Sequence, residues 1–112
     1  MSSSHQPIYW DSLGQSLAPT TAYGVDLPVG TTDWTVVNMS AGTIIVAATA
    51  ATIATGVTNS IPVLTGTSLS GKGQQLFVGN LTGGALAATV VWHRPGRQPD
   101  MDAGTASWNA LP

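Results

Sequence analysis

The sequence predicts an all-β protein: a small antiparallel β-sandwich of six to eight short strands with extended N- and C-terminal arms. Its 112 residues suit one domain. Its centre is rich in Val, Ile and Thr, which fit a pleated sheet, and turn residues recur there at short intervals. Only 7% of the residues are charged, and Lys72 is the only charged residue from Trp34 through Trp92. Jelly-roll-like and immunoglobulin-like sandwiches both fit this pattern, as does a small barrel.

Composition divides the chain into three parts. Residues 1–30 contain closely spaced prolines and predict an extended N-terminal arm. Residues 31–93 predict the sandwich body. Residues 94–112 carry both arginines and predict an extended C-terminal arm.

Runs of four to eight residues between turn signals predict the strands of the body. Within 51–58 the apolar and polar residues alternate, so that Ile53, Thr55 and Val57 share one face. Trp34 and Trp92 bracket the body and are expected to pack inside it or at one end. The predicted strands are 33–39, 43–48, 51–58, 61–65, 75–81 and 85–93.

Two segments of the body resemble each other. Residues 36–43 and 77–84 each contain an apolar strand that is followed by Asn, then Met or Leu, then Ser or Thr, then a small residue and Gly. We interpret each as a hairpin turned by a short loop whose Gly accepts a positive φ. A chance similarity in a chain rich in Gly, Thr and Val is the alternative.

The composition excludes several classes of protein. Three basic residues and a net charge of -2 argue against binding to nucleic-acid phosphates. The absence of Cys excludes disulfides, thiolate metal sites and Cys nucleophiles. Residues 1–10 lack the features of a signal peptide, and the uncharged stretch from 41 to 57 is mostly Ala and Thr. We therefore expect no nucleic-acid or membrane partner.

Three kinds of short motif resemble functional sites, and each has a simpler explanation. Residues 100–104 begin like a calcium loop, yet the chain has no Glu to complete it. Residues 71–73 resemble a fragment of a phosphate-binding loop without its other glycines. The segments 38–40 and 80–82 match the N-glycosylation acceptor, but the turn interpretation accounts for both.

Few residues are suited to catalysis. His5 and His93 are the only histidines. His93, Asp33 and a Ser or Thr hydroxyl are the residue types of a catalytic triad. The sequence contains no nucleophile-elbow pattern, so nothing in it indicates that these residues form one. We predict no enzymatic activity, no cofactor and no metal site.

The aromatic residues of the arms suggest contact with a partner. Tyr9 and Trp10 stand in an otherwise polar segment, and aromatic side chains dominate interface hot spots. The alternative is that the arms fold back on their own domain. The predicted partner-binding anchors are Ile8, Tyr9, Trp10, Leu13 and Trp108.

A β-domain with so few charges favours permanent association. Its strand edges lack the Lys residues that discourage edge pairing, and symmetric oligomers cover such surfaces. We expect a homo-oligomer in which the arms act as straps on neighbouring chains.

The polar arm over residues 1–26 and the compact segment from Val29 to Trp92 together resemble the capsid decoration (cement) proteins of tailed bacteriophages, and similar small β-sandwich virion proteins. The resemblance implies a β-rich trimer at the threefold or quasi-threefold positions of an icosahedral shell. It also implies that the chain stabilises the assembled capsid by bridging neighbouring major capsid subunits, with Tyr9 and Trp10 as anchors. The expected location is the virion, assembled in the host cytoplasm, and the lack of Cys fits that compartment.

Two other functions fit the same sequence. A phage neck, tail or head-fibre component would use ring symmetry in place of threefold packing. A carbohydrate-binding module would stack sugars on exposed aromatic rings, and loss of glycan binding on Trp34→Ala or Trp92→Ala would indicate this function.

Overall fold

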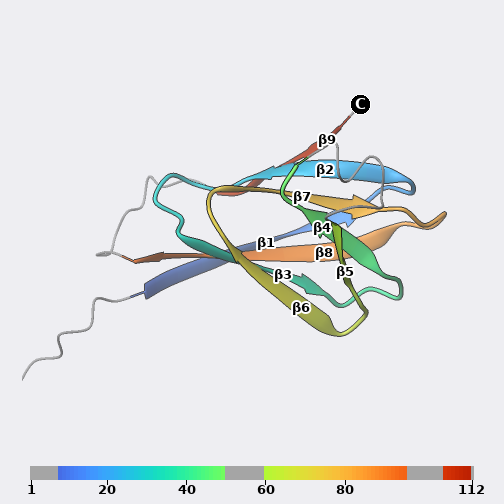
Figure 1. The fold of residues 1–112 in the computed structure, drawn as a ribbon, viewed down its shortest axis with the longest axis horizontal. Coiled ribbons are helices and arrows are strands. Elements are labelled where there is room, and N and C mark those ends of the chain that lie inside the picture. The colour runs from blue at the N-terminus through green and yellow to red at the C-terminus, as the bar shows by residue number, and fades with distance from the viewer. Residues whose placement is uncertain (1–7, 50–59, 96–104, 112) are drawn as a thin grey trace, which may run out of the picture.

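A computed structural model describes residues 8–49, 60–95 and 105–111, and these residues form nine strands in two antiparallel sheets without a helix (Figure 1). The strands are β1 (Ile8–Leu17), β2 (Thr21–Asp26), β3 (Asp33–Asn38), β4 (Ile44–Ala47), β5 (Ser60–Val63), β6 (Thr67–Lys72), β7 (Gln75–Asn80), β8 (Leu86–Pro95) and β9 (Ser107–Ala110). The predicted all-β sandwich is confirmed. The strand predicted over 51–58 lies outside the described residues.

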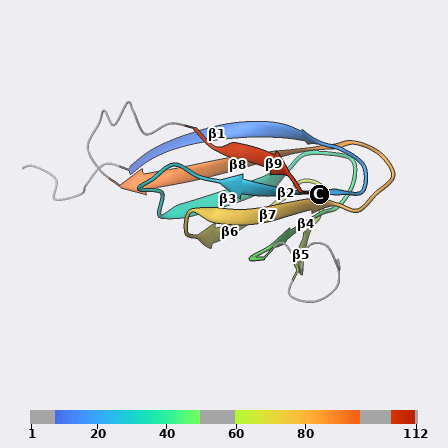
Figure 2. The same ribbon diagram turned by 90° about the horizontal axis from the view of Figure 1, so that it is seen from above.

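The strand order identifies the sandwich as a jelly roll. Four antiparallel pairs, β1 with β8, β2 with β7, β3 with β6 and β4 with β5, form one long hairpin. Rolling this hairpin brings β8 beside β3 and β7 beside β4, which gives the sheets β1-β8-β3-β6 and β5-β4-β7-β2-β9. Eight strands in two such sheets are the jelly-roll architecture, and β9 extends the second sheet (Figure 2).

The expected arms are corrected by this topology. Residues 8–17 and 21–26, predicted within the N-terminal arm of residues 1–30, form β1 and β2 and pair with β8 and β7. In the C-terminal arm of residues 94–112, β8 continues to Pro95 and β9 pairs with β2. The body therefore extends well beyond residues 31–93, because pairing with central strands satisfies the backbone of these polar segments.

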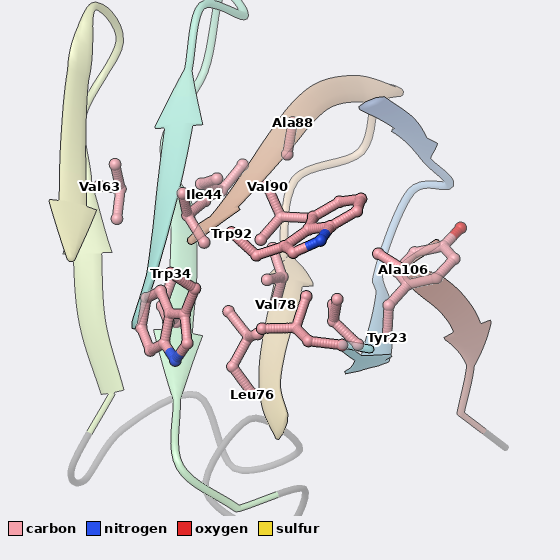
Figure 3. Packing of buried hydrophobic residues seen from close by; sticks show 14 of the residues in the cluster. Tyr23, Trp34, Ile44, Val63, Leu76, Val78, Ala88, Val90, Trp92 and Ala106 are labelled. Atoms are coloured by element: carbon pink, nitrogen blue, oxygen red, sulfur yellow. The ribbon is translucent and has the colours of Figure 1, made fainter. Parts of the chain in front are cut away.

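The core lies between the two sheets and is built from alternate residues of the central strands (Figure 3). Trp34 and Trp92, expected inside or at one end, are both buried. The Trp34 indole lies directly over Gly71 of the neighbouring strand. A Cβ atom at residue 71 would come within 2.7 Å of Trp34 Cη2, so this position has no room for a side chain. The other large members of the cluster are Leu17, Tyr23, Val25, Leu27, Val36, Ile44, Val46, Val63, Leu76, Val78 and Val90.

The two similar segments are arches between sheets, and the hairpin interpretation is wrong. β3 and β4 belong to different sheets, as do β7 and β8. In the first arch, the fully buried Asn38 donates from Nδ2 to the carbonyl oxygens of Gly42 and Val63, at 2.8 and 2.7 Å. Its Oδ1 accepts from the backbone N–H and the hydroxyl of Ser40, at 2.9 and 2.6 Å.

The second arch repeats this network. Asn80 Nδ2 donates to the carbonyl oxygen of Gly84 at 2.8 Å, and Oδ1 accepts from the backbone N–H and the hydroxyl of Thr82 at 2.9 and 2.7 Å. Gly42, Gly83 and Gly84 do not have the positive φ that we expected of them. The asparagine side chain therefore holds each crossing, and its buried, hydrogen-bonded amide explains both glycosylation-like motifs.

Candidate functional site

The described residues place charge at one end of the sandwich. We call this the charged end. Turns 27–32 and 73–74 meet there through backbone hydrogen bonds from Leu27 to Gln74, from Thr32 to His93 and from Gly73 to Thr32, at 2.8 to 3.0 Å. All charged side chains of the described ranges lie on the strand ends beside these turns: Asp11, Asp26, Asp33, Lys72 and Arg94.

The opposite end, which we call the loop end, carries no charge. It consists of residues 18–20, 39–43, 64–66 and 81–85. Backbone hydrogen bonds join these connections, from Thr20 to Thr82 at 3.1 Å and from Gly66 to Asn38 at 2.7 Å. Figure 1 shows the turns of this end on the right and those of the charged end on the left.

Three large aliphatic side chains project from the loop end. Met39, Leu64 and Leu81 are 77%, 57% and 49% exposed. Met39 and Leu81 each follow the arch asparagine, so the internal similarity of the sequence places them at equivalent positions. The three side chains lie at one end of the molecule on connections without charge, so their apolar surface is available for another protein to cover.

The charged end presents a row of four side chains on the outer face of the first sheet. Trp10 is opposite His93, His93 is opposite Asp33, and Asp33 is opposite Lys72. Directly opposite residues of an antiparallel pair share one face, so this cross-strand row crosses all four strands. Lys72 Nζ donates to Asp33 Oδ1 at 3.1 Å, and both side chains are exposed, at 87% and 46%.

A shallow groove of about 490 Å³ follows part of this row. Its walls include the outward-facing residues Asp33, Lys72 and His93. Thr35 and Ser70, which also line it, share a hydroxyl–hydroxyl hydrogen bond of 2.8 Å. The groove therefore contains polar side chains from β3, β6 and β8, and β1, the strand beside β8, carries the exposed indole of Trp10.

The structure separates the predicted anchors. Ile8 and Tyr9 lie on β1. Trp10 is 69% exposed. Side chains alternate between the two faces of a strand, so Leu13 lies on the other face of β1, toward the second sheet. The five anchors therefore do not form one patch on a free arm.

Trp108 is part of the folded body. It lies on β9, packs against the core and meets Tyr23 edge to face, with ring centroids 6.4 Å apart. The buried Trp34 and Trp92 are likewise unsuited to stacking a ligand, so the test that we based on them does not apply. Among the four tryptophans, Trp10 is the exposed one.

The sequence did not reveal that residues from distant segments come together at the charged end and at the loop end. Sequence reasoning considered His93 and Asp33 only for a catalytic triad, and Lys72 only as part of an incomplete phosphate-binding loop. No hydrogen bond joins the side chains of His93 and Asp33 within the described residues, which also hold no cluster of three metal-ligating side chains. None of the described residues belongs to a helix long and apolar enough to cross a membrane.

Comparison with known proteins gives no match to this chain, whether with family models, curated proteins or solved structures. The geometry of the two ends is therefore the basis for the function proposed below.

Proposed function

We propose that this chain is a non-enzymatic structural protein of a phage virion that binds the assembled capsid and stabilises it by bridging neighbouring major capsid subunits. The observation that carries the proposal is the loop end, where exposed Met39, Leu64 and Leu81 stand among connections without charge. Burying these side chains against a capsid surface is favourable because it removes apolar area from water.

The fold adds support by analogy. Jelly rolls are common in viral capsid proteins, although the same architecture also occurs in lectins and cupins. Eight strands on a twisted double sheet also hold the four connections of the loop end in fixed positions, which suits attachment to a repetitive surface. Binding only to the assembled shell stabilises that state by the difference in affinity.

The test is co-sedimentation of the full-length protein with expanded capsids of the phage whose genome encodes it. The triple variant Met39→Ser, Leu64→Ser, Leu81→Ser should bind at least about 100-fold more weakly, because three apolar contacts are lost. Val29→Ser is the matched control: Val29 is 83% exposed but lies in the turn at the charged end.

The triple variant should keep the melting temperature of the parent, since all three side chains are exposed. Failure of the parent protein to bind capsids, binding to isolated tails alone, or unchanged binding of the triple variant would contradict the proposal.

A further inference from the structure

We propose that the charged end carries a binding site for neutral saccharides, formed by Trp10, His93, Asp33 and Lys72 on the outer face of the β1-β8-β3-β6 sheet. This inference does not rest on the proposed function, because it uses the end of the sandwich opposite to the loop end. Three properties of the cross-strand row lead to it: an exposed flat ring, polar groups beside it, and a groove that continues the row.

The indole of Trp10 supplies the stacking surface. It is 69% exposed and lies on an edge strand, where one face of the sheet is open to a ligand. A pyranose ring has an apolar C–H face and a rim of hydroxyl groups. The C–H face fits an aromatic ring, which combines apolar area with a rigid plane.

The other members of the row supply hydrogen bonds to the hydroxyl groups. His93 is the register neighbour of Trp10, and Asp33 follows it at the next strand. The Asp33 carboxylate accepts hydrogen bonds from sugar hydroxyls, the Lys72 ammonium donates to them, and the imidazole can do either. Adjacent strands are about 4.8 Å apart, so the row spans about 14 Å, which suits a short oligosaccharide.

The charges favour a neutral ligand over an anionic one. The Lys72 ammonium is already paired with the Asp33 carboxylate at 3.1 Å, so the two charges on this face offset each other. An anion would therefore meet no net positive charge from these groups. The hydroxyl groups of Thr35 and Ser70 also line the groove, and hydroxyl groups can exchange hydrogen bonds with a sugar.

The volume of the groove and the fixed positions of its lining strands both suit a small-molecule site. Its volume of about 490 Å³ falls within the usual range for ligand sites. Its lining residues belong to β3, β6 and β8, whose pairing fixes their spacing before a ligand arrives. Because the site is shallow and open, we expect weak binding, with a Kd of about 0.1–1 mM per site.

The test is binding of the full-length protein to an array of immobilised neutral oligosaccharides: glucans, mannans, galactans and chitooligosaccharides. Soluble forms of those that bind are then titrated calorimetrically. Trp10→Ala should weaken binding at least about 10-fold and Asp33→Asn at least about 5-fold, which correspond to losing one stacked ring and one hydrogen bond to a charged group. Met39→Ser, exposed at the opposite end, should leave the Kd unchanged.

Fluorescence gives a second readout. Among the tryptophans of the described residues, Trp34 and Trp92 are buried and Trp108 is partly buried, so iodide should quench mainly Trp10. A bound saccharide should reduce this quenching in the parent protein and not in Trp10→Ala. Absence of binding to the whole array, unchanged binding of Trp10→Ala, or binding restricted to acidic glycans and abolished by about 0.5 M salt would overturn the inference.

The two proposals fail independently. Serine substitution of Met39, Leu64 and Leu81 is expected to weaken capsid binding and leave saccharide binding intact, whereas Trp10→Ala is expected to weaken saccharide binding and leave capsid binding intact.

Discussion

Asn38 and Asn80 hold the two crossings between the sheets by the same chemistry. Each primary amide uses both nitrogen protons and its oxygen, so the buried backbone groups of the arch have partners. Asn80 Nδ2 also approaches the carbonyl oxygens of Leu17 and Ala18, at 3.1 and 3.2 Å, which ties the arch to the end of β1. An aliphatic residue could not replace this set of bonds.

Asn80→Ala should lower the free energy of unfolding by about 3 kcal/mol, because the carbonyl oxygens and the Thr82 N–H lose their buried partner. Urea denaturation followed by circular dichroism measures the change. Thr82→Ser, which keeps the hydroxyl that bonds to Asn80, should alter stability by less than about 1 kcal/mol. A loss below about 1 kcal/mol for Asn80→Ala would mean that the backbone alone holds the arch.

At the scale of elements, β1 and β2 belong to the folded body. β1 contributes Leu17 to the core, and β2 contributes Tyr23 and Val25. β2 also lies between β7 and β9, so its removal would expose both neighbours. The prolines and polar residues of residues 1–30 concealed these strands from sequence reasoning, because their pairing partners lie in the second half of the chain.

Deletion of residues 1–26 should abolish cooperative unfolding, since it removes two strands of the eight-stranded roll together with their core side chains. A thermal melt followed by circular dichroism is the measurement. Deletion of residues 105–112 is the comparison: it removes β9, which only extends one sheet, and should leave a cooperative melt at a lower temperature. A sigmoidal melt for the first deletion would show that the strap interpretation of this segment was right.

At the scale of the whole molecule, the two ends of the sandwich differ in charge. The charged side chains of the described ranges gather at one end, and the only ion pair among them joins Lys72 to Asp33 in an exposed position. Cohesion between the sheets comes from apolar burial and from the two asparagine networks. This distribution suits a protein that attaches by one end and presents the other to solvent.

The stability of this molecule should depend little on ionic strength. Lys72→Gln should change the free energy of unfolding by less than about 0.5 kcal/mol, because an exposed ion pair contributes little. Raising sodium chloride from about 0.05 M to about 0.5 M should have an equally small effect. Chemical denaturation at both salt concentrations measures it, and a change above about 1 kcal/mol would reveal an electrostatic contribution that the described contacts do not contain.

The sequence by itself determined the all-β class, the packing of Trp34 and Trp92 inside the sandwich or at one end, and the scarcity of charge in the middle of the chain. These follow from local composition and alternation, which one segment reveals alone. It also revealed the similarity of the two asparagine segments, though not that they cross between sheets.

Only the tertiary structure decided which strands pair and which side chains share a surface. β6 illustrates this: it is rich in Ser, Gly and Thr and none of the predicted strands covers it, yet pairing with β3 makes it an edge strand. Trp10, His93, Asp33 and Lys72 likewise form one row only because β1, β8, β3 and β6 lie side by side in register. Register across a rolled hairpin depends on contacts between distant segments, and no local pattern specifies it.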